Sequence, residues 1–361
     1  MKIAELDTPA LLIDLDIMER NLNSMAAYTK AHGLRLRPHT KTHKIPALAR
    51  RQMDLGAAGI TVAKVGEAEV MVSSSPGELL VAYPVIGEKK LHRLMDVAKR
   101  TNLTVSLDSV EAAQGLSEAA RSARVKVGVL VEIDAGLGRV GVAPGSQVIS
   151  LAQAIDRLAN LEFRGIAFYP GHIKLMNDQG HAELERLGDL LGAVIGDLKS
   201  AGFAVQIVSG GSTPTMHYLH EVRHMNEARP GTYIFNDRNT ILSEACTLAD
   251  CAASILLTVV STAVPGQMII DGGSKTFSSD RASAPGFGYL VEAPEAVFEK
   301  MNEEHGYVDL KAVSKTFKVG ERVRMIPNHV CVAVNLHEQI YGIRGDNVEE
   351  TWKVEARGKL Q

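Results

Sequence analysis

Short apolar, β-branched runs alternate with amphipathic stretches from Pro9 to about Ala245. The runs recur at intervals of roughly 20 to 40 residues, and strands that alternate with helices in this way indicate βα units and a parallel sheet. We expect strands at Ala10–Asp14, Leu34–Arg37, Gly59–Ala63, Leu79–Tyr83, Thr104–Leu107, Val127–Ile133, Phe163–Phe168, Val205–Val208 and Gly231–Phe235. Eight of these would close a barrel and leave one for another layer.

The stretches between these runs carry apolar residues at spacings of three and four, which is typical of amphipathic helices. The clearest are Met18–Ala31, Gly87–Arg100, Ala112–Ala123 and Ala182–Ala201. Their polar faces fit an outer ring of helices around a barrel.

Beyond Cys246 the pattern changes to β runs separated by turns. The expected strands are Ser254–Val264, Met268–Asp271, Tyr289–Glu292, Tyr307–Leu310, Arg322–Pro327, Val330–Leu336 and Ile340–Arg344. This pattern predicts a second, all-β domain. The fold class is therefore α/β, with a (β/α)8 barrel over residues 10–245 and a β domain over residues 246–361 that also includes residues 1–9.

Composition narrows the classes of function. The chain has 361 residues and a formal net charge of -3, which argues against a nucleic-acid binder, whose surface is markedly basic. No apolar run approaches the roughly 20 residues that span a bilayer, and the start lacks the apolar core of a signal peptide. We expect a cytoplasmic protein with small-molecule partners. Its three cysteines, Cys246, Cys251 and Cys331, form no CxxC motif, so thiols or one metal ligand are expected rather than a disulfide framework.

A basic cluster, Arg37 to Lys44, lies where an expected strand gives way to a helix. The carboxyl ends of barrel strands carry the functional groups of such folds. Like charges around Lys41, together with partial burial, favour a neutral, nucleophilic amine that forms an imine. The alternative is a solvated basic turn.

Other polar loops follow the later strands, and two of them suit a phosphate. Ser209-Gly210-Gly211-Ser212-Thr213 combines flexible backbone with hydroxyl donors just before an expected helix start at Pro214. Arg229-Pro230-Gly231-Thr232-Tyr233 offers a second glycine-hydroxyl turn at the next strand. Neither matches a nucleotide-binding fingerprint.

In the β domain, His329 and Cys331 lie two residues apart on an expected extended run, where both side chains would point to one face. Nitrogen and sulfur ligands favour zinc, with manganese-like ions as an alternative. Two strong ligands would leave coordination positions open for water and substrate. A lone HxC pair can also be accidental.

Together these segments resemble the fold-type III pyridoxal phosphate enzymes of the alanine racemase type. The resemblance is strongest to the branch of metal-dependent D-threonine aldolases and eukaryotic-type D-serine dehydratases, and it covers nearly the whole chain. The motifs that carry it are Asp7-Thr8-Pro9, Arg37 to Lys44, Glu132 to Gly141, Tyr169 to His172, Ser209 to Thr213, Arg229 to Tyr233, Asp271 to Lys275 and Pro327 to Cys331.

The resemblance implies a role for each motif. Lys41 matches the Schiff-base lysine, with Lys44 as a supporting charge, and Arg139 matches an arginine that faces the cofactor's phenolate oxygen. Arg229 matches the arginine that alanine racemases place against the pyridine nitrogen. His329 and Cys331 match the metal pair, and His172 is a candidate base or a loop cap. The implied cofactor-binding set is Lys41, Arg139, Tyr169, Ser209, Gly210, Gly211, Ser212, Thr213, Arg229, Gly231, Thr232 and Tyr233.

The expected activity is that of a pyridoxal phosphate- and divalent-metal-dependent lyase of D-β-hydroxy-α-amino acids, and D-threonine aldolase is favoured. Cys331 instead leans toward a D-serine or D-3-hydroxyaspartate dehydratase, because the better-known aldolases tend to have aspartate there. The stretches Val65 to Val70, Ala82 to Pro84 and Tyr169 to His172 look more like the aldolases. A non-catalytic cofactor carrier and an amino-acid racemase rank lower. The resemblance also implies a homodimer.

Overall fold

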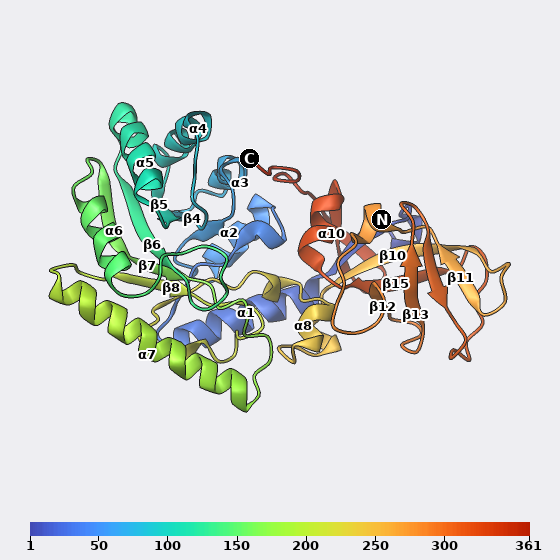
Figure 1. Ribbon diagram of the computed structural model, residues 1–361. Helices are drawn as coiled ribbons and strands as arrows, with labels where there is room; N and C mark the ends of the chain where they lie inside the picture. The colour runs from blue at the N-terminus through green and yellow to red at the C-terminus, as the bar shows by residue number, and fades with distance from the viewer. The chain divides into compact units, whose positions relative to one another are not determined.

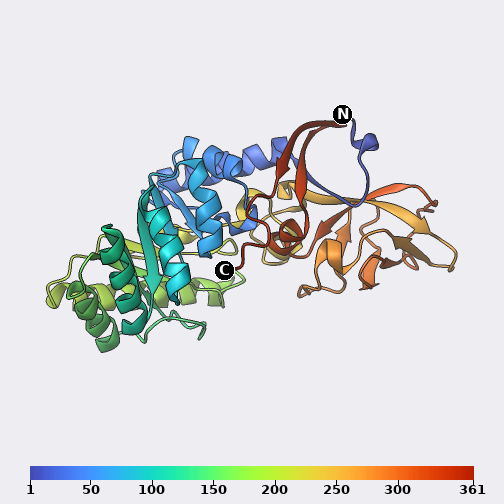
Figure 2. The ribbon, with the colours of Figure 1, turned by 90° about the horizontal axis from the view of Figure 1, so that it is seen from above.

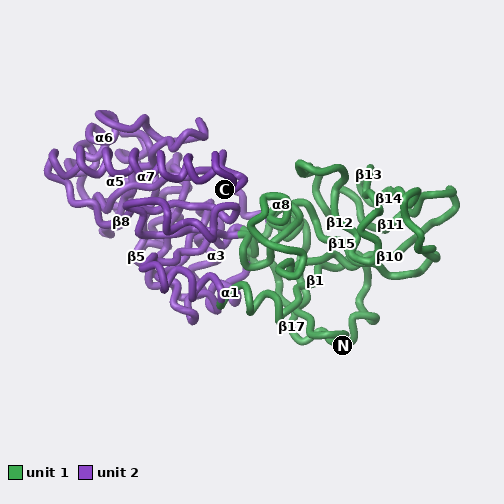
Figure 3. The backbone as a smooth tube through the Cα atoms, turned by 90° about the horizontal axis from the view of Figure 1, so that it is seen from below, with its two compact units in different colours: residues 1–23, 42–44, 232–357 green, residues 24–41, 45–231, 358–361 purple.

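The computed structural model describes residues 1–361, which fall into two compact units. The first unit comprises residues 1–23, 42–44 and 232–357, and the second comprises residues 24–41, 45–231 and 358–361. Figure 3 colours them green and purple. The sequence pattern placed the main boundary at residues 245/246, whereas the chain passes between the units at residues 231/232.

The second unit is built on an eight-stranded parallel sheet (Figure 1). Its strands are β2 (Arg35–Leu36), β3 (Ile60–Val62), β4 (Glu78–Val81), β5 (Asn102–Leu107), β6 (Val127–Ile133), β7 (Leu161–Phe168), β8 (Ile207–Gly210) and β9 (Glu227–Ala228). They lie in the order β2-β9-β8-β7-β6-β5-β4-β3. A parallel bridge between His39 and Thr61 joins the two ends of this order, so the sheet closes into the predicted barrel.

Helices follow most of the barrel strands. They are α1 (Leu15–Ala31), which begins in the first unit, α2 (Pro46–Asp54), α3 (Val65–Met71), α4 (Glu88–Ala98), α5 (Val110–Ala123), α6 (Ser146–Asp156) and α7 (Asp178–Ser200). Side-chain caps fix two starts: Ser109 accepts from the Ala112 N–H at 3.4 Å, and Asn177 accepts from the Gly180 N–H at 3.0 Å. None of the helices combines the length and hydropathy of a membrane span.

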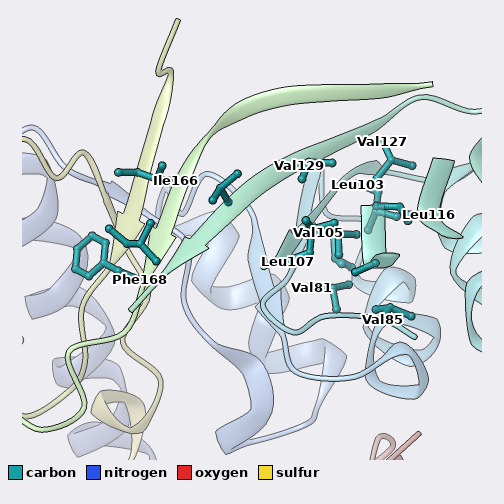
Figure 4. Packing of buried hydrophobic residues seen from close by; sticks show 14 of the residues in the cluster. Val81, Val85, Leu103, Val105, Leu107, Leu116, Val127, Val129, Ile166 and Phe168 are labelled. Carbon is teal, nitrogen blue, oxygen red and sulfur yellow. The ribbon is translucent and has the colours of Figure 1, made fainter. Parts of the chain in front are cut away.

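The main core lies between the strands and these helices (Figure 4). Val105, Leu107 and Val129 come from the strands, and Leu116 comes from α5. All seven residues of β6 are buried, as expected for a parallel strand covered on both faces. Each fully buried Val or Leu side chain contributes about 1.5–3 kcal/mol, so this layer is the main source of the unit's stability.

A charged cluster also lies within the second unit. Arg37 is 1% exposed, and its Nη2 donates to Glu227 Oε2 at 2.9 Å and to Glu78. Glu227 is fully buried, and its Oε1 accepts from Ser209 Oγ at 2.8 Å. Burial alone would lower the pKa of Arg37, but the Glu227 and Glu78 carboxylates outweigh it and raise that pKa. The cluster therefore joins β2, β9, β8 and β4.

The first unit contains a nine-stranded sheet. Its main path is β13-β14-β11-β10-β1-β16-β17, and β15 pairs with β10 and β12. The strands are β1 (Ala10–Asp14), β10 (Ala253–Ser261), β11 (Gln267–Ile270), β12 (Gly288–Leu290), β13 (Val297–Met301), β14 (Gly306–Asp309), β15 (Arg322–Pro327), β16 (Gln339–Arg344) and β17 (Asn347–Lys353). Figure 2 shows the β16–β17 hairpin beside the N-terminus, where Lys2 bridges to Asn347.

Several sequence-based expectations were wrong in detail. Ala10–Asp14, expected at the start of the barrel domain, pairs antiparallel with β10 and parallel with β16 in the other sheet. The expected strand Gly231–Phe235 is a 3₁₀ turn at Thr232–Ile234, and the barrel strand there is β9. The expected strand Val330–Leu336 is helix α10, because Val330, Ala333 and Val334 are buried on one helical face.

The first unit is also not all β. Besides α10 (Val330–Leu336) it holds the short helices α8 (Arg238–Leu242) and α9 (Ser274–Phe277). Strands β13 and β17 were not expected, because many of their residues are charged and exposed. Most buried positions of the sheet were nevertheless evident in the apolar runs.

Candidate functional site

Five neighbouring barrel strands carry the predicted cofactor residues at or just beyond their carboxyl ends. In the order β2-β9-β8-β7-β6, these residues are Lys41, Arg229, Ser209, Tyr169 and Arg139. Parallel strands end at one mouth of a barrel, so these residues share that mouth. The strand order therefore groups residues that are up to 188 positions apart in the chain.

Lys41 lies in a 3₁₀ turn, Thr40–Thr42, directly after the bridge between His39 and Thr61. Its backbone N–H points to His39 Nδ1 at 3.4 Å, and its side chain is exposed. The expectation of partial burial was therefore wrong for Lys41. The burial instead falls on the next three residues, Thr42 to Lys44, which belong to the other unit.

Lys44 contacts α10. It adopts a left-handed backbone conformation with φ 58°, which is uncommon for a residue other than glycine. Its Nζ donates to Asn335 Oδ1 at 2.9 Å, and its carbonyl accepts from the Ala356 N–H at 3.1 Å. These contacts fix the segment that follows Lys41 against the helix that carries Cys331.

Arg139 lies on a loop that Asp134 organises. Asp134 Oδ1 accepts from the Gly138 and Gly136 N–H groups, both at 3.0 Å, and these bonds lower the pKa of Asp134. The Arg139 guanidinium lies 4.7 Å from the centre of the Tyr169 ring, within cation–π range. Two of the predicted cofactor residues therefore contact each other.

His172 packs under the same loop. A Cβ on Gly136 would lie 3.2 Å from His172 Cε1, so the glycine allows the ring to approach the backbone. His172 Nε2 lies 4.0 Å from Glu183 Oε2, and the side chain is 30% exposed. The ring is thus partly accessible, as a general base requires.

The first glycine-hydroxyl turn packs closely against Phe168 at Gly210, and we call this part of the turn the Gly210 cradle. A Cβ on Gly210 would lie 2.3 Å from the Phe168 ring, and Gly211 has φ 90°. The Ser209 hydroxyl already donates to Glu227, whereas Ser212 Oγ lies 3.2 Å from Thr215 Oγ1. No helix begins at Pro214, because the bonds from Met216 N–H to Thr213 and from Tyr218 N–H to Thr215 form separate turns.

Arg229 is buried between strand ends. Its Nη2 donates to the carbonyls of Phe168 at 2.8 Å and Ser209 at 3.4 Å. Its Nε is buried without a hydrogen-bond partner, and burial lowers the pKa of Arg229. An unpaired buried donor is rare and costly, so this atom marks a place where a ligand acceptor would fit. The Gly210 cradle and this donor both suit a phosphorylated, nitrogen-bearing ring.

The sequence predicted that His329 and Cys331 lie on a strand, but neither residue does. His329 is the extended residue before α10, with φ -135°, and Cys331 lies in the first turn of that helix. The chain turns here because the Val330 N–H donates to Asp237 Oδ2 at 3.0 Å. The Cys331 sulfur raises the pKa of His329 to about 11, and Asp237 adds to this effect.

Two hydroxyl groups flank the Cys331 sulfur. Cys331 Sγ donates to Thr42 Oγ1 at 3.3 Å and lies 3.7 Å from Thr232 Oγ1. Thr42 follows Lys41, and Thr232 follows Gly231. No third His, Cys, Asp or Glu completes a ligand set here, so a metal on this pair would keep open positions.

The other two cysteines form a separate pair. The Cys246 and Cys251 thiols are hydrogen-bonded to each other, and this contact together with burial raises the pKa of Cys251. All three cysteines are free thiols. Only Cys331 lies beside the predicted metal ligand His329.

The sequence assigned no role of its own to Thr42, which lies within the basic cluster Arg37 to Lys44, and it did not indicate Asp237 or Glu227. Glu227 and Asp237 lie within the cluster around Ser209 and beside His329, respectively. Asp237 and Thr240 form a helix-capping pattern that the sequence does contain. That pattern predicts only a helix cap, and it does not indicate that Asp237 contacts His329.

Two family models match the chain. Residues 13–239 match "Alanine racemase, N-terminal domain", and residues 252–343 match "Putative serine dehydratase domain". D-threonine aldolase from an Arthrobacter species is 31% identical over 99% of this chain and 94% of that protein. 3-Hydroxy-D-aspartate aldolase from Paracoccus denitrificans (strain Pd 1222) is 33% identical over 99% of this chain and 94% of that protein.

Solved structures agree in fold. D-threonine aldolase from Filomicrobium marinum superposes with a TM-score of 0.94 at 34% identity, covering 100% of this chain and 98% of that one. A cysteine-to-alanine variant of D-threo-3-hydroxyaspartate dehydratase in the metal-free form has a TM-score of 0.89 at 29% identity, covering 98% of both chains. The chain belongs to the alanine racemase N-terminal domain family, within the fold-type III pyridoxal phosphate enzymes that include these aldolases and dehydratases.

Proposed function

We propose that this chain is a pyridoxal phosphate- and divalent-metal-dependent lyase that cleaves D-β-hydroxy-α-amino acids, with D-threonine aldolase activity. One observation carries the proposal. The Cys331 thiol contacts Thr42, the residue after Lys41, and lies beside Thr232, the residue after Gly231. The predicted metal ligand Cys331 thus contacts the residue that follows the predicted cofactor lysine in the chain, and it lies beside a residue of the second glycine-hydroxyl turn.

The cofactor-binding roles follow from the barrel mouth. Lys41 would hold the aldehyde carbon, Arg139 and Tyr169 would face the ring, and Arg229 Nε would donate to the ring nitrogen. The phosphate would lie against the two glycine-hydroxyl turns, which comprise Ser209, Gly210, Gly211, Ser212, Thr213, Gly231, Thr232 and Tyr233. Pyridoxal phosphate, when bound, supplies an electron sink for charge at the α-carbon of an amino acid.

His329 and Cys331 would hold a divalent metal, zinc or manganese, which supplies Lewis acidity toward a substrate hydroxyl. Relatives support this pairing. Two variants of D-threo-3-hydroxyaspartate dehydratase replace a histidine and a cysteine two positions apart, and the cysteine variant is in the metal-free form. His329 and Cys331 have the same spacing.

Which proton a base of this chain removes from the substrate then determines whether the reaction is an aldol cleavage or a dehydration. If a base removes the β-hydroxyl proton, the Cα–Cβ bond breaks and the products are glycine and an aldehyde. His172 is our candidate for that base, because its ring is partly accessible and lies beside the Arg139 loop.

Dehydratase activity is the second candidate, and Cys331 favours it. In that case Lys41 would remove the α-proton, hydroxide would leave from the β-carbon, and hydrolysis would give a keto acid and ammonia. Serine-type and 3-hydroxyaspartate-type substrates both carry the required hydroxyl. The two outcomes differ in which bond is held perpendicular to the cofactor ring.

One experiment separates these activities. The purified holoenzyme is incubated with D-threonine, D-serine or D-3-hydroxyaspartate, with and without added Zn²⁺ or Mn²⁺, and the products are identified. Glycine plus acetaldehyde from D-threonine supports the aldolase, whereas 2-oxobutanoate plus ammonia as the sole products would reject it. If the protein converts none of these substrates and chelators have no effect on it, a non-catalytic cofactor carrier is the remaining function.

A matched variant tests the cofactor lysine. Lys41→Ala should lose both the visible absorbance of the bound cofactor and the activity, whereas Lys64→Ala, after the next strand, should keep that absorbance. Retention of both properties in Lys41→Ala would show that another lysine holds the cofactor.

We also propose that the protein is a homodimer, because the enzymes that it resembles suggest one. Light scattering of the purified protein would test this proposal.

A further inference from the structure

Asp237 lies beside His329, and all its acceptor positions are used. Its carboxylate is 1% exposed. Oδ1 accepts from the N–H and the hydroxyl of Thr240, at 2.9 and 2.8 Å. Oδ2 accepts from the Val330 N–H at 3.0 Å and lies 3.2 Å from His329 Nδ1. One buried side chain therefore contacts both α8 and the start of α10.

The contact with His329 determines which ring nitrogen can bind a metal. A carboxylate only accepts hydrogen bonds, so Nδ1 must carry the hydrogen in this contact. Once the ring is neutral, as a metal ligand must be, the other nitrogen, Nε2, is the only one with a lone pair for a metal. Such a carboxylate–histidine contact fixes the tautomer and the ring orientation and increases the ligand's basicity.

The second contact of Oδ2 acts on the other predicted ligand. Because the Val330 N–H donates to Asp237, the chain turns between His329 and Cys331, and Cys331 enters the first turn of α10. The separation of the two ligands thus depends on the same carboxylate. Sequence spacing alone does not define it, since the two residues differ in backbone conformation.

We propose that Asp237 is a positioning residue of the metal site, which directs His329 Nε2 toward a divalent metal and sets the place of Cys331. The inference rests on the proposed function, because that function assigns the metal to His329 and Cys331. It adds a residue 92 positions away in the chain whose carboxylate touches one ligand and sets the backbone between both.

Two substitutions separate this role from helix capping. Serine caps helices about as well as aspartate, but it is too short to reach His329, so Asp237→Ser keeps the start of α8 and loses the contact. Asp237→Asn keeps one oxygen that can accept for the cap of α8, but its NH2 group then replaces Oδ2 and cannot accept from His329 Nδ1 or from the Val330 N–H. Asp250→Ser is the control, because Asp250 caps another turn in the same unit through Thr247.

The affinity for Mn²⁺ and Zn²⁺ is measured on the chelator-treated holoenzyme by competition with a chromogenic chelator. Asp237→Ser and Asp237→Asn should each weaken metal binding by about tenfold to a hundredfold, and Asp250→Ser by less than about twofold. Cofactor absorbance should stay unchanged. Turnover should recover at saturating metal, which damage to the fold would not allow.

His329→Ala distinguishes the inference from the proposal beneath it. If His329→Ala binds metal as tightly as the parent, the metal site is misplaced and both ideas fail. If His329→Ala loses the metal while both Asp237 variants stay within about twofold of the parent, Asp237 has no positioning role and the proposed function stands. If the serine variant unfolds, the asparagine variant gives the answer, because it keeps the cap.

Discussion

The Cys331 sulfur lies 3.3 Å from the hydroxyl oxygen of Thr42, which is fully buried and directly follows Lys41. The two residues are 289 positions apart in the chain. Thr42 is thus covalently next to the predicted cofactor lysine and in contact with the predicted metal ligand.

Replacing Thr42 by valine should weaken metal binding. Valine keeps the branched shape but removes the hydroxyl that can donate a hydrogen bond to the sulfur once a metal is bound. We expect the affinity for Mn²⁺ or Zn²⁺ to fall by about tenfold, in the range for residues that support metal ligands. Thr42→Ser keeps the hydroxyl and should stay close to the parent. Equal metal affinities for the valine and serine variants would show that the hydroxyl contact has no role.

Removing Glu227 should destabilise the barrel. Glu227 is fully buried and pairs with Arg37, which is 1% exposed, so Glu227→Ala leaves a buried charge without its main partner. Breaking such a pair costs about 3–5 kcal/mol. Urea unfolding monitored by circular dichroism measures this loss.

An exposed pair provides the control for Glu227. Arg50 Nε lies 3.0 Å from Asp54 Oδ1, and both side chains are 59% exposed. Asp54→Ala should cost no more than about 1 kcal/mol. A loss for Glu227→Ala no larger than that for Asp54→Ala would mean that the buried pair is not what stabilises the barrel.

The positions of the predicted cofactor residues could be obtained from the sequence because they depend on local patterns. Alternating strands and helices indicate a parallel barrel, and the carboxyl ends of its strands form one mouth. Lys41 and Arg139 follow such ends and Ser209 lies in the last two residues of β8, so their common location needs no knowledge of long-range contacts. The sheet to which strand β1 belongs was predicted wrongly, because an apolar run alone does not indicate which sheet the strand joins.

The metal pair shows where local patterns fail. Val330-Cys331-Val332-Ala333-Val334 is rich in β-branched residues, which favour a strand, yet it forms helix α10. The helical signal was the buried spacing of Val330, Ala333 and Val334, which became decisive only with tertiary packing. Asp237 supports this turn from 93 positions away, and no sequence pattern links the two.

The Glu78 ion pair should make the barrel sensitive to acid. Burial alone would raise the pKa of Glu78, but Arg37 and Arg35 outweigh it and hold that pKa below its usual 4.5. A depressed carboxyl pKa stabilises the fold fully above the unfolded value and loses its effect as pH falls through the folded value. The stability difference between the parent and Glu78→Gln should therefore be largest near neutral pH and shrink below about pH 4. Unfolding curves across this range check it, and a constant difference would contradict it.

A methyl group at Gly210 should abolish cofactor binding. The added Cβ would lie 2.3 Å from the Phe168 ring, and Phe168 is fully buried at the end of β7, so neither side can yield without moving the predicted phosphate turn. Gly196 provides the matched control: it is exposed within α7, and a Cβ there meets nothing within 4 Å. Gly196→Ala should stabilise the protein by about 0.5–1 kcal/mol, because alanine is the better helix former. Titration of both apoproteins with pyridoxal phosphate, followed by visible absorbance, measures the cofactor affinity. A Gly210→Ala protein that binds the cofactor as tightly as Gly196→Ala would place the phosphate elsewhere.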